Sequence, residues 1–119
     1  MPQSYRASCH CGAVRLSFEA ETITQGLRCT CSICSRKGAM MTPEAIPKEA
    51  IHLEADQADV GLYQFDSKIA KHYFCKHCGI FTHNETMRVP GHCRVNLGCI
   101  EDLDTSDFEV VVFDGKNLL

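Results

Sequence analysis

The sequence predicts a single, mostly β domain over residues 1–119, built from antiparallel sheets. Several segments alternate apolar and polar residues with a period of two, which is typical of half-buried strands. No segment sustains the period of 3.6 residues that indicates a helix. Seven of the nine cysteines fall into three tight clusters, and such clusters indicate metal ligands that fasten one turn of a β domain to another.

Composition and charge narrow the class of protein. The chain has 119 residues, of which 45% are hydrophobic and 23% charged, a balance typical of a folded globular domain. The formal net charge of -3 argues against a nucleic-acid partner, because such binding needs a basic face. No apolar run has the length of a signal-peptide core or of a membrane span, so we expect a cytoplasmic protein without a membrane partner. Disulfides are rare in that compartment, which again favours metal ligation.

The first 50 residues contain four expected strands. Residues Ala13–Ala20 alternate in polarity, and Tyr5–Ser8 precede them as a partner strand. Gly26–Cys29 leads as a short strand into a loop that holds three cysteines, and Ala39–Thr42 resumes as a strand after that loop. Two prolines bound Pro43–Glu49, which we expect to form a surface turn with one short helical segment at most.

The rest of the chain is expected to consist of strands as well. The segments with strand-like composition are Ile51–Glu54, Gly61–Phe65, Ile69–Phe74, Ile80–His83, Arg94–Ile100 and Phe108–Phe113. A turn that contains two cysteines joins the third and fourth of these segments into a hairpin. Acidic turns follow each of the last two segments.

The first and third cysteine clusters are turns of the kind that presents two sulfurs to a metal ion. They read Cys9-His10-Cys11-Gly12 and Cys75-Lys76-His77-Cys78-Gly79. A glycine after the second cysteine suits the left-handed backbone angle of a metal knuckle. If two such knuckles met around one ion, they would supply the four tetrahedral sulfurs of a structural zinc site. The spacing alone leaves open which cluster partners which.

The middle cluster places Cys29, Cys31 and Cys34 on one loop, so three sulfurs could converge on one ion. Three protein ligands plus a position for water or substrate is the pattern of catalytic zinc. The alternative is a second structural site whose fourth ligand comes from elsewhere, such as Cys93, Cys99 or a histidine. The spacing favours neither interpretation.

Two basic residues, Arg36 and Lys37, follow the middle cluster. They would add positive charge near the thiolates and are candidates to bind the carboxylate of a substrate. A solvated basic turn is the alternative interpretation.

With these motifs in order, the chain resembles the glutathione-dependent formaldehyde-activating enzyme family, also called the CENP-V/GFA domain, which has an Mss4-like β fold. The matching segments are Ser8–Arg15, Cys29–Ala39, Tyr63–Phe65, Phe74–Ile80 and Val95–Asp102. They span nearly the whole chain, and the combined cysteine pattern is highly specific.

The resemblance implies two zinc ions. It assigns a structural zinc to Cys9, Cys11, Cys75 and Cys78, and a catalytic-type zinc to Cys29, Cys31 and Cys34. The implied activity is that of a carbon–sulfur lyase that joins a small thiol such as glutathione to a small aldehyde, in the manner of S-hydroxymethylglutathione synthase. A non-catalytic, zinc-stapled binding module with the same fold is the alternative function.

Overall fold

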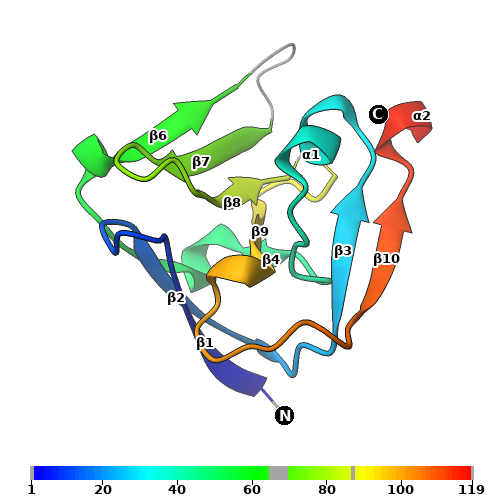
Figure 1. Ribbon diagram of the computed structural model, residues 1–119, viewed down its shortest axis with the longest axis horizontal. Helices are drawn as coiled ribbons and strands as arrows, with labels where there is room; N and C mark the ends of the chain where they lie inside the picture. Colours follow the sequence, from blue (N-terminus) through cyan, green and yellow to red (C-terminus); the bar gives the residue numbers. More distant parts are fainter. Residues whose placement is uncertain (1, 65–69, 87, 119) are drawn as a thin grey trace.

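The computed structural model describes residues 2–64, 70–86 and 88–118, and its described part is mostly β, as predicted (Figure 1). The described strands form one three-stranded sheet, one five-stranded sheet and one two-stranded pair. No helix among the described residues is long and apolar enough to cross a membrane.

The three-stranded sheet confirms the hairpin expected at the start of the chain. Strand β1 (Pro2–Ser8) pairs antiparallel with β2 (Arg15–Glu21), and β5 (His52–Glu54) adds to the other edge of β2. Alternate residues of β1 and β2 face inward, so Tyr5 and Phe18 lie opposite each other with their rings stacked at 5.6 Å between centroids. The period of two in the sequence therefore marks the buried face of this sheet.

The five-stranded sheet is antiparallel and carries the turn of the third cysteine cluster. Its strands, in spatial order, are β4 (Ile46–Pro47), β9 (His92–Val95), β8 (Phe81–Glu85), β7 (Lys71–Cys75) and β6 (Val60–Tyr63). The β7–β8 hairpin is the one the sequence predicted. Phe65 and Ile69, the ends of two expected strands, lie outside the described residues.

The two-stranded pair departs from the predicted antiparallel arrangement. Strand β3 (Gln25–Cys29) pairs in parallel with β10 (Glu109–Phe113), with Cys29 opposite Phe113. A parallel pair needs a long crossover connection, and here the five-stranded sheet lies within that connection. Local sequence patterns do not predict such a pairing, because about 80 residues separate its two strands.

Short helical segments replace structure that we expected to be loop or strand. The middle cluster runs into helix α1 (Ser32–Lys37), which ends at Gly38 in the left-handed conformation, φ 64°. Helix α2 (Gly115–Leu118) follows β10. Six and four residues are too few to produce a helical period in the sequence, so pattern analysis missed both.

Three further expectations need correction. In Ala39–Thr42 only Met41 forms β-bridges, to Leu27 and Asn96, because that residue links two sheets rather than extending one. The strand expected over Arg94–Ile100 ends at Val95 and continues as the 3-10 turn η3 (Leu97–Cys99). The surface turn at Pro43–Glu49 contains β4.

The remaining short elements are the 3-10 turns η1 (Lys48–Ala50) and η2 (Gln57–Asp59). The main core lies between the sheets and gathers Tyr5, Ala7, Leu16, Phe18, Ile23, Ile46, Val95, Leu97, Cys99 and Ile100. A second, small cluster of buried residues forms around Val14 beside the first and third cysteine clusters.

Candidate metal centres

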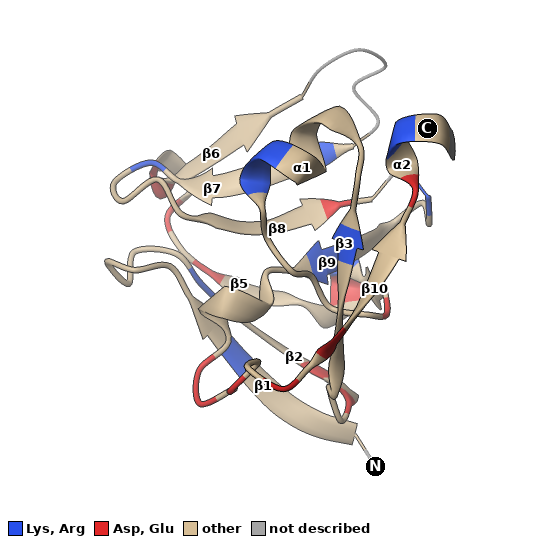
Figure 2. Cartoon of the chain, turned by 45° about the vertical axis from the view of Figure 1, so that its right-hand side comes forward, with Lys and Arg blue, Asp and Glu red and all other residues tan. Residues whose placement is uncertain are grey.

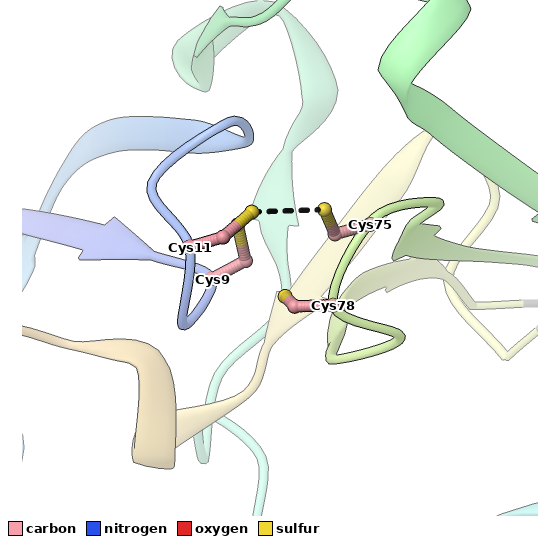
Figure 3. A group of neighbouring side chains, drawn as sticks. All are labelled: Cys9, Cys11, Cys75 and Cys78. Carbon is pink, nitrogen blue, oxygen red and sulfur yellow. Dashed lines mark hydrogen bonds between the residues drawn. The ribbon is translucent and has the colours of Figure 1, made fainter.

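The first and third clusters meet to form what we call the four-cysteine cluster, Cys9, Cys11, Cys75 and Cys78 (Figure 3). All four sulfurs lie within 4.8 Å of one another. The Cys11 sulfur is 3.7 Å from that of Cys9 and 3.6 Å from that of Cys75. A tetrahedron with zinc–sulfur bonds of about 2.3 Å has sulfur–sulfur edges of about 3.8 Å. The cluster therefore has the dimensions of a tetrahedral metal site.

Two glycine-containing turns bring these sulfurs together. In the turn between β1 and β2, Gly12 adopts a φ of 85°, and in the turn between β7 and β8, Gly79 adopts a φ of 76°. The Gly79 N–H donates to the carbonyl of Cys75 at 2.9 Å, which closes the second knuckle. The positive angles fit glycine, as predicted, because a Cβ at these positions would strain the backbone.

Backbone N–H groups point at the sulfurs of this cluster. The Val14 N–H donates to the Cys9 sulfur at 3.3 Å, and the His77 N–H donates to the Cys75 sulfur at 3.4 Å. Backbone hydrogen bonds from Cys11 and Ile80 lower the pKa of Cys78 to about 6. These bonds favour the thiolate form, which is the form that ligates a metal.

The histidine inside the third cluster does not join the ligand set. The His77 imidazole bonds instead to the Asp59 carboxylate, with Nε2 and Oδ1 2.6 Å apart. Because Asp59 also accepts a hydrogen bond from the backbone N–H of Lys76 through its carbonyl, η2 braces this knuckle from outside. Such outer contacts fix the orientation of ligating residues.

The middle cluster, which we call the three-cysteine cluster, also converges in space. The sulfurs of Cys29, Cys31 and Cys34 lie within 4.8 Å of one another, and each residue is half-buried. Cys29 ends β3, Cys31 is the N-cap of α1, and Cys34 lies within α1. Among the residues described, no fourth cysteine, histidine or carboxylate joins this group.

The three-cysteine cluster opens into a cavity of about 710 Å³. Four basic residues line it, namely Lys37, Arg88, Arg94 and Lys116. No aspartate or glutamate is among its described lining residues. Figure 2 shows basic residues on α1, β9 and α2, three elements that contribute to this cavity. The cavity is therefore suited to an anion.

Lys37 is held deep in the cavity wall. Its Nζ lies 3.1 Å from Nδ1 of His72 and 3.7 Å from the centroid of the Phe81 ring. Burial lowers the pKa of Lys37. Burial, with a smaller contribution from Lys37, lowers the pKa of His72 to about 4, so this ring is neutral at physiological pH.

The two arginines of the cavity are also fixed by their surroundings. Arg94 donates from Nη1 to the carbonyls of Thr42 at 2.8 Å and Pro43 at 2.9 Å. The Arg88 guanidinium lies 3.4 Å above the ring centroid of Phe113. An anchored guanidinium loses little conformational entropy when it binds an anion, which favours recognition of a carboxylate.

The candidates named from the sequence separate in space. Lys37 lines the cavity, whereas the exposed Arg36 is not among the lining residues and donates to the carbonyl of Ser32 at 2.7 Å. Cys93 and Cys99 are buried and belong to neither cluster, and burial raises the pKa of each to about 11.

Sequence reasoning missed three cations of the cavity, Arg88, Arg94 and Lys116. They lie far along the chain from the three-cysteine cluster, and only the tertiary structure brings them to it. Their positions carry no motif, so no local signal in the sequence could have identified them.

A mostly β domain with two cysteine clusters, each able to hold a metal ion, defines a class of metal-binding β proteins. The chain belongs to the glutathione-dependent formaldehyde-activating enzyme family, whose pattern matches residues 4–114. It is also similar to a protein of Rhodobacter sphaeroides of known crystal structure, with 30% sequence identity and a TM-score of 0.78. That similarity covers 89% of this chain and 99% of the other.

Proposed function

We propose that this protein is a zinc-dependent carbon–sulfur lyase that acts on adducts between a small thiol and a small aldehyde. The observation that carries the proposal is the three-cysteine cluster, which has no fourth donor among the described residues and opens into a cation-lined cavity. Three sulfur ligands with one position left for substrate is the arrangement of a catalytic site. The family description supplies the reactants, glutathione and formaldehyde.

We propose that the four-cysteine cluster has a structural role and the three-cysteine cluster a catalytic one. Zinc in the four-cysteine cluster would hold the first hairpin to the β7–β8 hairpin, because its ligands come from both. Zinc in the three-cysteine cluster, when bound, would lower the pKa of a thiol that reaches it. The lack of disulfides among the cysteines fits a reducing compartment such as the cytoplasm.

The residues of the cavity would orient the thiol substrate. Glutathione carries two carboxylates, and the cations Lys37, Arg88, Arg94 and Lys116 surround the space beside the cysteines. Charge-assisted hydrogen bonds to these groups would fix the substrate with its sulfur toward the three-cysteine cluster. Positioning of this kind can supply a large part of the rate of a two-substrate reaction.

The proposed reaction needs no oxidant or reductant. In the forward direction a carbon–sulfur bond forms between the thiol sulfur and the aldehyde carbon, and the sulfur-bound proton ends on the former carbonyl oxygen. In the reverse direction the carbon–sulfur bond breaks and the proton returns to sulfur. His72 lines the same cavity and, because it is neutral at physiological pH, would add no charge to its wall.

Exchange NMR of glutathione mixed with formaldehyde tests the proposal. We expect the zinc-loaded protein to accelerate exchange between free glutathione and its hydroxymethyl adduct. The variant Cys31→Ser should lose one of two zinc ions and the acceleration, while it keeps its fold. Arg36→Gln serves as the control, because Arg36 is exposed and not among the residues that line the cavity.

An exchange rate in the presence of the two-zinc protein equal to that in buffer would refute this substrate pair. If the same protein then bound a protein partner through the cavity, the binding-module function would replace the lyase.

A further inference from the structure

The beginning of α2 lies against the three-cysteine cluster, although more than 80 residues separate them in sequence. The parallel pairing of β3 with β10 sets Phe113 opposite Cys29, so both strands end at the same place. Figure 1 shows α1 and α2 at that common end. The residues that follow β10 therefore form one wall of the cluster.

Within this wall, Gly115 lies directly against the cysteines. A Cβ built on Gly115 would lie 2.4 Å from the Cys29 sulfur, 3.0 Å from Cβ of Cys31 and 3.1 Å from the Cys31 backbone nitrogen. All three atoms belong to two candidate metal ligands, Cys29 and Cys31, and one of them is the Cys29 sulfur itself. A larger residue could be accommodated only if the Cys29 sulfur or the backbone at residue 115 moved.

The reason for glycine here is close approach rather than backbone conformation. The φ of Gly115 lies outside the positive range that favours glycine. A Cβ at this position is therefore opposed by the nearby atoms of Cys29 and Cys31 and not by the backbone angle.

Hydrogen bonds hold the wall in place against the cysteine-bearing turn. The Thr30 N–H donates to the carbonyl of Phe113 at 3.1 Å, and the Lys116 N–H donates to Oγ1 of Thr30 at 3.2 Å. Oγ1 of Thr30 also donates to the Asp114 carboxylate at 3.3 Å. Thr30 stands between Cys29 and Cys31, so these bonds tie the wall to the ligand turn itself.

We propose that Gly115 is a positioning residue of the three-cysteine metal centre, and that Thr30 anchors the segment that carries it. The bare backbone at Gly115 closes one flank of the cluster and leaves the Cys29 sulfur where it converges with the other two. The cluster also faces the cavity that Lys37 and Arg94 line. The proposal deepens the proposed function, on which it rests for the presence of a metal ion.

Titration with Co²⁺ tests this inference, because thiolate-to-cobalt absorption reports on the ligand set without any assay of activity. We expect Gly115→Ala to lower the affinity of one of two cobalt sites by about 10–100-fold, the range typical of lost support around a metal site. The absorption of that site should change, and the other site should be unaffected. Thr30→Val should shift the same site in the same direction to a smaller extent.

Gly98→Ala is the matched control, because Gly98 also lies in a short helical segment and its added Cβ would meet only Asn96, at 3.3 Å. Two sites in Gly115→Ala with the affinities and spectra of the wild type would overturn the inference. Loss of both sites and of the circular dichroism spectrum of the folded protein would also overturn it, because that result would show that Gly115 supports the whole fold.

The proposed function can fail separately. A wild-type protein that binds two ions without accelerating adduct exchange refutes glutathione and formaldehyde as the substrate pair and leaves the role of Gly115 intact.

Discussion

Lys37 and His72 contact each other at the wall of the cavity, with Nζ of the lysine 3.1 Å from Nδ1 of the histidine. An ammonium group has no acceptor, so Nδ1 of His72 accepts this hydrogen bond and its ring carries its proton on Nε2. The contact fixes the Lys37 charge near the three-cysteine cluster, three residues after Cys34. The contact links α1 to β7, two elements that are not consecutive in the chain.

Replacement of Lys37 should weaken binding of an anionic thiol. A hydrogen bond to a charged group in a buried setting contributes about 1.5–3 kcal/mol, which corresponds to about 10–100-fold. We therefore expect Lys37→Gln to raise the KM for glutathione by at least about tenfold, measured by the exchange assay at varied thiol concentration. Arg36→Gln should leave KM unchanged, and equal effects of the two variants would contradict the role of Lys37.

Acidification should destabilise the fold through two buried histidines. Burial lowers the pKa of His72 and of His83 to about 4, from an ordinary value of 6.5. Between about pH 6.5 and pH 4 the unfolded chain then binds up to about two more protons than the folded chain. The contribution of the two neutral histidines to stability is therefore present above pH 6.5 and is lost as the pH falls toward 4.

The variant His83→Phe separates this effect from the acid-induced loss of metal. The phenyl ring preserves the stacking on Tyr73, whose ring centroid lies 4.6 Å from that of His83. Urea denaturation at several pH values gives the free energy of unfolding as a function of pH. The slope of that function should be smaller in the variant, by the amount that corresponds to about one proton. Identical slopes would show that His83 titrates normally.

Loss of one ligand should have different consequences in the two clusters. Cys75→Ser removes a completely buried sulfur that ties two hairpins together, so we expect the free energy of unfolding to fall by more than about 4 kcal/mol. Cys31→Ser should cost much less stability, because Cys29, Cys31 and Cys34 lie on one continuous segment. Zinc analysis and thermal unfolding of both proteins check this, and equal destabilisation would contradict it.

Alanine at Gly79 should strain the second knuckle of the four-cysteine cluster. A Cβ there meets no atom within 4 Å, so only the backbone angle, φ 76°, opposes it. A left-handed conformation costs a residue with a Cβ about 1–2 kcal/mol, and we expect that loss of stability in Gly79→Ala. Gly98→Ala, which has no such angle, is the control in chemical denaturation. A loss of similar size in both variants would show that the angle is not the cause.

Much of the fold and of both candidate centres could be predicted from the sequence. The hairpins can be predicted from the alternation of apolar and polar residues, as in Ala13–Ala20, because one face of each strand is buried. The cysteine turns are readable because a knuckle needs two sulfurs and a glycine in a few residues. Helices α1 and α2 were missed because each is too short to display a period.

The sequence by itself determined that the chain forms a mostly β domain with clustered sulfurs, since strand burial and knuckle turns are local properties. Only the tertiary structure decided what surrounds the three-cysteine cluster. Parallel pairing of β3 with β10 places Gly115 against Cys29, and the five-stranded sheet brings Arg94 to the same cavity. Such contacts depend on the packing of elements far apart in the chain, which no short sequence pattern encodes.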